Sequence, residues 1–239
     1  MDRLMSDHSI QSLDVHVLHI PAKAVHSHGS GDVSGINVAL LELTTDTGLT
    51  GWGEASPWPV FTGTVEAAGA ALHTHFAPFV LGADPVQVEP LMTCAEATLV
   101  AHPEAKAALE CALLDLAGQI AGLSIAELVG GIARREMPLS FSVANPDFDA
   151  DLEDIARLWE DGTRLFKLKT GFNDHAFDIM RLEKLRALYG DDIGLRIDYN
   201  QGLPAHDAIR HVRDLETFRP DFVEPVSYTH LTLPTKRIV

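Results

Sequence analysis

The first half of the chain changes from a strand pattern to a helix pattern near Thr64. Residues 10–55 hold apolar runs and alternations, and the segment INVALLELTTDTGLTGWGEA is interrupted at Asp46–Gly48 before the pattern resumes, as in an antiparallel hairpin. From Thr64 to about Val129 the chain is rich in alanine and leucine at helical spacing, with proline and glycine interruptions that begin at Pro78. The pattern predicts an α+β domain.

The clearest predicted helix runs from Pro103 to Gly118, where apolar residues recur every three or four positions. Its many alanines indicate close packing against neighbouring elements. Cys94 and Cys111 lie in this alanine-rich region, and the sequence predicts that both are buried free thiols. Gly130 and Gly131 then end the helical region.

The second half of the chain alternates between short apolar strands and helical stretches. The strands are predicted near MPLSFSVAN, RLFKLKT, IGLRIDYN and DFVE, and the helices at 149–161, 174–189 and 204–217. The strand centres fall roughly 25–30 residues apart, which is typical of βα units in a parallel barrel or a doubly wound sheet. We therefore expect an α+β domain followed by βα repeats.

Two lysines interrupt the second of these strands. Residues two apart on a strand project from the same face, so Lys167 and Lys169 point together while Phe166 and Leu168 occupy the opposite face. Two ammonium groups side by side repel each other, and burying them without partners is costly. Either this face is open to solvent, or a neighbouring group makes use of the pair.

Acidic residues follow at the ends of the next two strands. Asp198 and Asn200 share a face with Arg196, and Glu224 ends the last predicted strand. Ligands of parallel sheets and barrels bind at the carboxyl ends of strands, so these side chains and the lysines are expected to converge on one rim. Two carboxylates there suit Mg²⁺, and a lysine whose pKa is lowered by its neighbour and by the metal can act as a base at neutral pH.

Each of these features also has an ordinary explanation. A Lys-x-Lys pair is common on exposed strands, and a single acidic residue at a strand end is often a helix cap. Their joint occurrence at the ends of consecutive strands favours a site over those explanations.

Composition and charge restrict the possible partners. The chain has 239 residues, 46% of them hydrophobic, which is enough to build a core. Its formal net charge of −16 argues against non-specific binding to nucleic acid or to an anionic membrane. The start, MDRLMSDHSI, lacks the basic and apolar regions of a signal peptide, and no run is long enough to span a bilayer. The sequence predicts a cytoplasmic protein.

The motifs FKLKTG, RIDYNQG and FVE, in this order, resemble those of the enolase superfamily, in its muconate lactonizing enzyme-like branch. GLTGWGEASP and ALECALLDLAGQIAGLSIAELVGG resemble the capping domain of that family and the helix leading into its barrel. The resemblance covers about residues 10–224. It implies an α+β N-terminal capping domain followed by a (β/α) TIM-type barrel, a small carboxylate substrate, a Mg²⁺ cofactor and a homo-oligomeric parent protein; lysine bases with Mg²⁺ are a known pattern of this superfamily.

The resemblance also implies roles for individual residues. Lys169 would be the acid/base acting on the carbon next to the substrate carboxylate, and Lys167 would tune it and contact that carboxylate. Asp198 and Glu224 would be the first two metal ligands, with Asn200 supporting the site.

Two segments of the capping domain, AKAVHSHGSG and SPWPVFTG, correspond to the loops that set substrate choice in the family. His26, His28, Trp58 and Phe61 are therefore candidates for closing over the ligand. The histidine pair alone does not make a metal motif, because two histidines on a glycine-rich loop are more often polar loop residues. GSGDVSG lacks the Lys-Ser/Thr of a phosphate-binding loop, so phosphate binding is not expected there.

The family pattern breaks after Glu224. A third acidic ligand and a second basic group are expected later in the barrel, but the chain continues as PVSYTHLTLPTKRIV and stops. We expect a capping domain at 1–136, the first half of an incomplete barrel at 137–226 and a tail foreign to the fold at 227–239. The chain itself is then expected to be inactive and poorly soluble, with apolar inward side chains left facing water.

The reaction predicted for the parent protein is Mg²⁺-assisted proton abstraction alpha to a carboxylate, by a racemase, an epimerase or a cycloisomerase. An acid-sugar dehydratase of the mandelate racemase branch stays open, because it shares the lysine strand. A non-catalytic fragment stays open as well.

Overall fold

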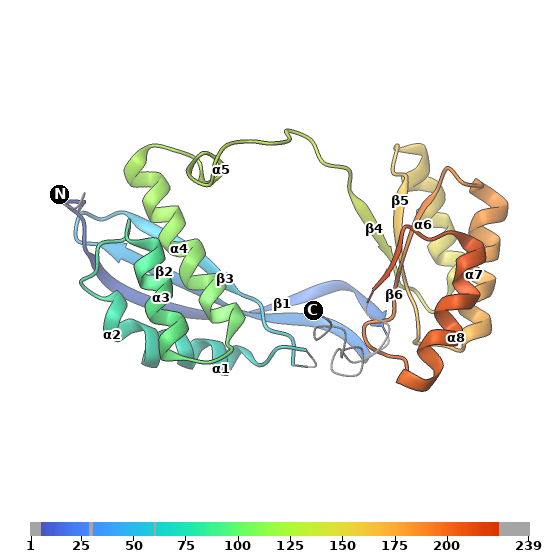
Figure 1. Ribbon diagram of the computed structural model, residues 1–239, viewed down its shortest axis with the longest axis horizontal. Helices are drawn as coiled ribbons and strands as arrows, with labels where there is room; N and C mark the ends of the chain where they lie inside the picture. The colour runs from blue at the N-terminus through green and yellow to red at the C-terminus, as the bar shows by residue number, and fades with distance from the viewer. Residues whose placement is uncertain (1–5, 29–30, 60, 225–239) are drawn as a thin grey trace, which may run out of the picture. The chain divides into compact units, whose positions relative to one another are not determined.

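The computed structural model describes residues 6–28, 31–59 and 61–224, which group into two units. Of the described residues, the first unit comprises 6–22, 35–59 and 61–135, and the second comprises 23–28, 31–34 and 136–224 (Figure 1). The tail predicted at 227–239 lies outside the described residues.

The first unit contains a three-stranded sheet in the order β1-β2-β3. Strand β1 spans Ile10–His28, β2 spans Gly31–Thr45 and β3 spans Thr50–Ala55. Strands β2 and β3 pair antiparallel from Ala39 opposite Ala55 to Thr44 opposite Thr50. The hairpin predicted from the sequence is confirmed.

Strand β1 extends through a segment that the sequence predicts as a loop. The backbone is extended as far as His28, where a loop was expected over AKAVHSHGSG. Pairing of β1 with β2 overrides the weak strand propensity of its alanine residues. The predictions for the side chains of His26 and His28 lie outside the described residues, which leave out the side chains of 24–33.

The helices of the first unit follow the sheet in the order α1 (Val65–Ala70), η1 (Ala71–Phe76), α2 (Ala77–Val80), α3 (Val88–Thr98), α4 (Pro103–Ala121) and α5 (Ile125–Leu128). The interruption predicted at Pro78 is instead a change of helix type, because the π-helical segment η1 leads directly into α2. Pro78 lies in the first turn of α2, where its missing N–H is tolerated.

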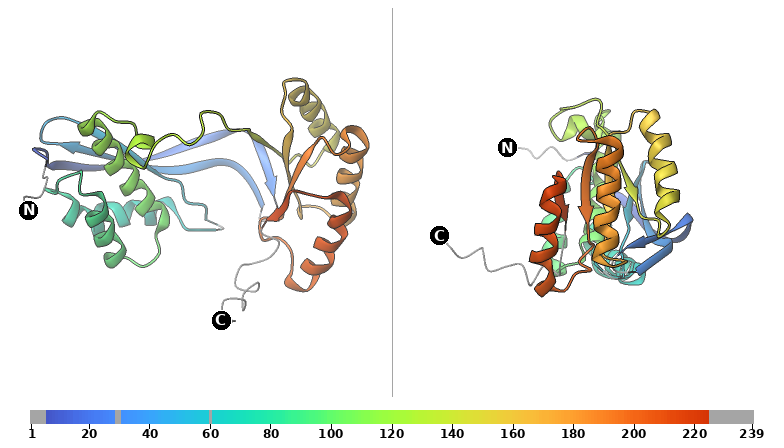
Figure 2. Two further views of the ribbon diagram at one scale, coloured as in Figure 1. Left: turned by 45° about the horizontal axis from the view of Figure 1, so that its top comes forward. Right: turned by 90° about the vertical axis from the view of Figure 1, so that its right-hand side faces the viewer.

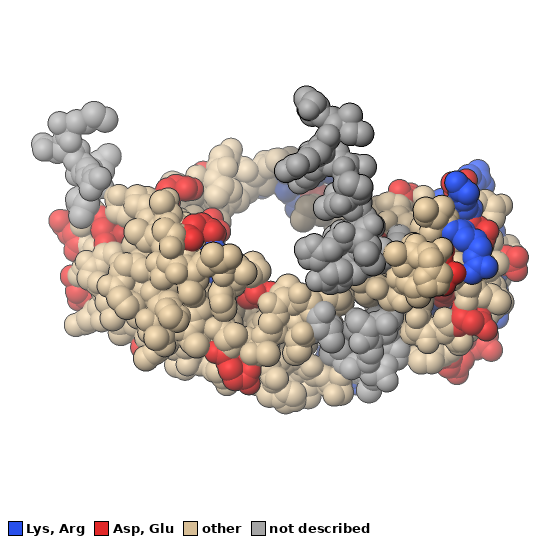
Figure 3. Space-filling model, turned by 60° about the horizontal axis from the view of Figure 1, so that its bottom comes forward, with Lys and Arg blue, Asp and Glu red and all other residues tan. Residues whose placement is uncertain are grey.

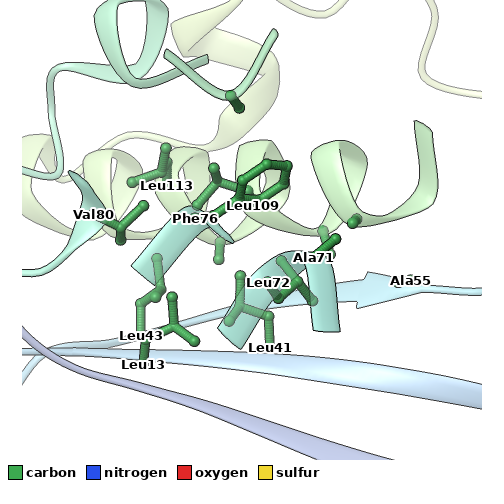
Figure 4. Packing of buried hydrophobic residues seen from close by; sticks show 14 of the residues in the cluster. Leu13, Leu41, Leu43, Ala55, Ala71, Leu72, Phe76, Val80, Leu109 and Leu113 are labelled. Carbon is green, nitrogen blue, oxygen red and sulfur yellow. The ribbon is translucent and has the colours of Figure 1, made fainter. Parts of the chain in front are cut away.

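The core of the first unit lies between the sheet and the helices. Figure 4 shows leucines of β1 and β2 packed against side chains of η1, α2 and α4; the labelled residues include Leu13, Leu41, Leu43, Leu72, Phe76, Val80, Leu109 and Leu113. Strand β3 touches α4 through its glycines: a Cβ on Gly53 would lie 1.9 Å from the Ala108 carbonyl oxygen, and one on Gly51 would lie 2.5 Å from that of Ala112. The close packing predicted from the alanines is confirmed.

The two cysteines are free thiols, as predicted, but both are exposed. The prediction that they are buried is wrong. The buried residues of α4 include Ala108, Leu109, Ala112 and Leu113, so Cys111 falls just outside the buried stripe. An alanine-rich composition does not reveal which side of a helix faces the core.

The second unit contains four parallel strands in the order β4-β5-β6-β7. They are β4 (Ser140–Val143), β5 (Leu165–Lys169), β6 (Gly194–Asp198) and β7 (Phe222–Glu224). The helices between them are α6 (Phe148–Glu160), α7 (His175–Tyr189) and α8 (Ala205–Leu215), followed by the short η2 (Glu216–Phe218). These helices lie on one face of the sheet (Figures 1 and 2). The predicted βα order is confirmed, and the fold is an incomplete TIM-type barrel after an α+β domain.

The two faces of the parallel sheet differ in polarity. The side chains of Phe166, Leu168, Leu195 and Ile197 are fully buried in the core of the unit. The alternate positions on β5 and β6 carry the two lysines, Arg196 and Asp198. The expectation that the inward side chains are apolar is therefore wrong, because apolar side chains are concentrated on the face that packs on the helices.

No helix among the described residues is both long enough and apolar enough to cross a membrane. On the face drawn in Figure 3, acidic side chains appear over both units, in keeping with the net charge of −16.

Candidate active site

The polar strand ends of the second unit lie in one row. Lys169 pairs in register with Asp198, and Asp198 pairs in register with Glu224. Because the three strands are parallel and adjacent, their last side chains project from neighbouring positions on one rim. The convergence predicted for these three residues is present in the structure.

The lysines and the carboxylates are in direct contact. Lys169 Nζ donates to Asp198 Oδ2 at 2.6 Å and to Asn200 Oδ1 at 3.0 Å. Lys167 Nζ lies 3.4 Å from the same Asp198 oxygen and 2.6 Å from Glu224 Oε1. The contact with Glu224 is an ion pair whose angles are not those of a hydrogen bond. Lys169 thus bridges Asp198 and Asn200, and Lys167 bridges Asp198 and Glu224.

The turn after β6 holds Asn200 in place. Asn200 has a φ of 46°, a left-handed conformation that asparagine tolerates better than most residues. Its backbone N–H donates to Asp198 Oδ1 at 2.9 Å. Asp198 is only 3% exposed, and both of its oxygens accept hydrogen bonds from this small cluster.

The pKa of Lys167 reflects its burial and two nearby carboxylates. Burial lowers the pKa of Lys167, but the nearby carboxylates of Glu224 and Asp198 outweigh this effect and raise it above its ordinary value. The prediction that Lys167 lowers the pKa of Lys169 stays a prediction. Strand register places Asp198 and Glu224 beside the Lys167 ammonium, and their charges outweigh the effect of its burial.

The oxygen atoms of Asp198 and Glu224 are suitable ligands for a hard divalent cation. The described residues contain no group of three or more histidine, cysteine, aspartate or glutamate side chains arranged to hold a metal. Mg²⁺ is commonly bound by one or two carboxylates and completes its shell with water and substrate. Two carboxylates at paired register positions fit that pattern, provided that the lysine ammonium groups move away from the oxygens that they now contact.

A buried charge pair on α7 holds the turn that follows β5, and sequence reasoning missed it. Arg181 is completely buried, and its Nη2 donates to the Lys169 carbonyl and to Asp178 Oδ1, both at 2.7 Å. Asp178 Oδ2 accepts the Gly171 N–H at 3.2 Å. The signal in the sequence is an acidic and a basic residue three apart on the otherwise apolar side of a helix.

Asp151 in the first turn of α6 lies near this pair. Its Oδ2 accepts the Asn145 N–H at 3.0 Å. Burial raises its pKa to about 6, and the hydrogen bond from Asn145 and the charge of Arg181 only partly oppose the rise. The folded unit therefore keeps a proton on Asp151 at pH values where the unfolded chain has lost it.

This proton predicts a pH dependence of stability. Between about pH 4 and pH 6 the folded state binds more protons at Asp151 than the unfolded state does, so this residue lowers the free energy of unfolding as pH rises. Asp151→Asn removes that contribution. Urea titrations should show the variant gaining stability relative to the parent between pH 4 and pH 7, by at most about 3 kcal/mol. A difference between the two proteins that does not change with pH would contradict the assignment.

The two aromatic candidates lie in the first unit. The Trp58 carbonyl accepts the N–H groups of Phe61, Thr62 and Gly63, and the Trp58 and Phe61 rings have centroids 6.1 Å apart. They therefore form one small aromatic pair on a tight turn. Their role in closing over a ligand stays a prediction.

Two family models match the chain. One, described as the N-terminal domain of mandelate racemase / muconate lactonizing enzyme, matches residues 13–130. The other, described as enolase C-terminal domain-like, matches residues 150–235.

Individual relatives agree with these matches. The chain is 30% identical to an L-Ala-D/L-Glu epimerase of Clostridium acetobutylicum over 210 residues, which are 87% of this chain and 58% of the epimerase. It is 28% identical to an N-succinyl-L-Arg/Lys racemase of Bacillus cereus, covering 90% of this chain and 58% of the racemase. The crystal structure of a muconate cycloisomerase from Azorhizobium caulinodans superposes with a TM-score of 0.76 at 42% identity, covering 90% of this chain and 57% of that protein. The chain thus spans less than two thirds of the length of these relatives.

Proposed function

Because this chain belongs to the mandelate racemase/muconate lactonizing enzyme branch of the enolase superfamily, we propose that the protein is an isomerase that removes a proton alpha to a carboxylate. The observation that carries the proposal is the row of Lys169, Asp198 and Glu224 on adjacent parallel strands. The relatives named above are an epimerase, a racemase and a cycloisomerase, and all three names describe isomerases.

In this proposal the neutral amine of Lys169 removes the proton, and the ammonium formed in that step returns it. The side chain of Lys169 is 19% exposed, and its ammonium contacts Asp198 and Asn200, so it is held at the strand end. A base must lie within hydrogen-bond reach of the proton that it takes, and Lys169 is the last residue of β5, on the rim where the proposal places the ligand. Asn200 steadies the ammonium through its side-chain oxygen.

Lys167 has a different role in the proposed reaction: it binds the substrate carboxylate. It remains an ammonium at neutral pH, because the carboxylates beside it raise its pKa. A permanent positive charge next to the base suits the binding of the substrate carboxylate.

Asp198 and Glu224 would hold Mg²⁺. When bound, the cation would supply positive charge for the substrate carboxylate and for the negative charge that develops when the alpha proton is removed. Asp198 and Glu224 now neutralise the lysines; if these oxygens held the cation, the ammonium groups would be available to contact substrate.

Metal binding can be measured on the 239-residue chain. Replacing Asp198 by asparagine keeps the size of the side chain but removes a charged ligand, so the affinity for Mg²⁺ in calorimetry should fall by at least about tenfold. Asp191→Asn is the matched control, because Asp191 pairs with Arg219 on the surface. Equal affinities for the parent and Asp198→Asn would remove Asp198 from the metal site.

The proposed reaction is tested in an extended chain, in which residues 1–224 are joined to the C-terminal portion of the Azorhizobium caulinodans relative. Dipeptides, N-succinyl amino acids and a muconate are incubated with it and Mg²⁺ in deuterated water, and NMR follows loss of the alpha proton or lactone formation. Mg²⁺-dependent turnover of one of these classes supports the proposal. If none turns over in a folded protein that binds Mg²⁺, the chain has a binding role and the proposal is wrong.

A further inference from the structure

The backbone immediately after β5 is held at three consecutive residues by three different partners. The Lys169 carbonyl accepts from Arg181, the Thr170 N–H donates to the Asp198 carbonyl at 2.9 Å, and the Gly171 N–H donates to Asp178. The bond to Asp198 continues the pairing of β5 with β6, whereas the other two bonds come from side chains of α7. Here the fixed residues begin at the proposed base.

The two α7 side chains that hold this turn are themselves firmly fixed. Arg181 and Asp178 are 0% and 1% exposed and form an ion pair with each other. The guanidinium carbon lies 4.9 Å from the centre of the Phe177 ring and 5.1 Å from that of Phe172, contacts that are favourable to a cation. The guanidinium therefore cannot shift without disturbing the packing around it.

Stability alone does not account for this buried pair. Removing two charges from water is expensive, and buried pairs are often no more stabilising than apolar residues of the same size. Burial lowers the pKa of Arg181 and raises that of Asp178, as expected where desolvation opposes the charged forms. The pair instead fixes the positions of two backbone groups. Arg181 holds the Lys169 carbonyl, and Asp178 holds the Gly171 N–H.

Gly171 is part of the same arrangement. Its φ is +78°, and a Cβ at this position would lie 3.1 Å from Tyr199 Cδ1. A glycine allows the turn to bend sharply beneath the Tyr199 ring, so the path of the chain after Lys169 is set by sterics as well as by hydrogen bonds.

We infer that Arg181 and Asp178 are positioning residues that fix the Lys169 side chain through its backbone. Neither touches the rim where a ligand would bind; both act through the turn at 169–171. This inference rests on the proposed function only in naming Lys169 as the base, since the positioning itself is a property of the folded chain.

The test is competitive labelling of lysines by an acylating reagent in the 239-residue chain, read by mass spectrometry, with Lys106 of the first unit as the internal reference. Lys167 is the built-in comparator, because it lies inside β5 and is held by pairing to both neighbouring strands. Arg181→Met should increase labelling of Lys169 by roughly tenfold, the scale of a lost hydrogen bond to a charged group, and change that of Lys167 by less than about twofold. Arg181→Lys, which keeps a charged donor, should restore part of the protection.

Arg186→Met is the matched control. Arg186 also lies on α7 and donates to four carbonyls, those of Gly190, Ile193, Phe218 and Arg219, but none of these belongs to the turn at 169–171. Arg186→Met should destabilise the second unit without a selective increase in the labelling of Lys169. If Arg181→Met does not fold, Asp178→Asn serves in its place, since the amide keeps an acceptor for Gly171 and loses the charge that holds Arg181.

The outcomes separate the two proposals. Selective labelling of Lys169 supports positioning even if the extended chain shows no turnover, in which case only the proposed function fails. Equal increases at Lys167 and Lys169, or the same pattern in Arg186→Met, would show a purely structural role and overturn the inference. Unchanged labelling of Lys169 in a folded Arg181→Met protein would overturn it as well.

Discussion

Replacing Lys169 by methionine in the extended chain should lower the rate of alpha-proton exchange by about 10²–10⁴-fold, the usual contribution of a general base. Methionine keeps much of the length and apolar stem of lysine but cannot accept or deliver a proton. Asp198 keeps Lys167 as a partner in this variant, because Lys167 Nζ also lies 3.4 Å from it. The rim should therefore stay intact while the chemistry is lost.

The measurement is deuterium incorporation at the substrate alpha carbon in the presence of Mg²⁺. Lys184→Met is the matched control: Lys184 is an α7 lysine that pairs with Asp149 on the surface, with 45% of its side chain exposed. It should exchange at the parent rate. Exchange at the parent rate in Lys169→Met would show that another group is the base.

Replacing Gly53 by alanine should destabilise the first unit by about 3 kcal/mol or more, at the upper end for overpacked sites. The new methyl would lie 1.9 Å from the Ala108 carbonyl oxygen, and that oxygen belongs to the backbone of α4. A flexible side chain could rotate away, but here the helix itself must move off the sheet. Thermal unfolding of the 239-residue chain should shift to markedly lower temperature.

Gly69→Ala is the control for this change. Gly69 lies in α1, and the nearest atom to an added Cβ is Val15 Cγ1 at 3.8 Å, an ordinary contact. Alanine in a helix is favoured over glycine by about 0.5–1 kcal/mol, so this variant should be as stable as the parent or more so. Similar melting temperatures for Gly53→Ala and the parent would mean that β3 and α4 are less closely packed than described.

The sequence was sufficient to predict the elements that carry the rim. Alternation along RLFKLKT places Phe166 and Leu168 on one face and the two lysines on the other, and the structure agrees. The positions of Asp198 and Glu224 at strand ends followed from the same pattern. The face of a strand that a side chain occupies can be predicted from local periodicity, because it depends only on residues adjacent in the chain.

The features that escaped prediction depend on residues distant in the chain. Lys167 meets Glu224 only because β5, β6 and β7 are neighbours in register, so the rise in its pKa was not foreseeable from the lysine pair alone. Arg181 reaches the Lys169 carbonyl across a helix–strand contact, which no spacing in the sequence reveals. The exposed side of Cys111 likewise depends on how α4 is turned toward the sheet.

The ion pairs on the rim have a consequence for how the rim forms. Many metal-binding domains cannot fold until the ion arrives, because their ligands repel one another without it. Here Asp198 and Glu224 already have positive partners in Lys169 and Lys167. The lysines thus act as internal counter-ions for the two carboxylates, so this row of side chains can take up its arrangement before magnesium binds.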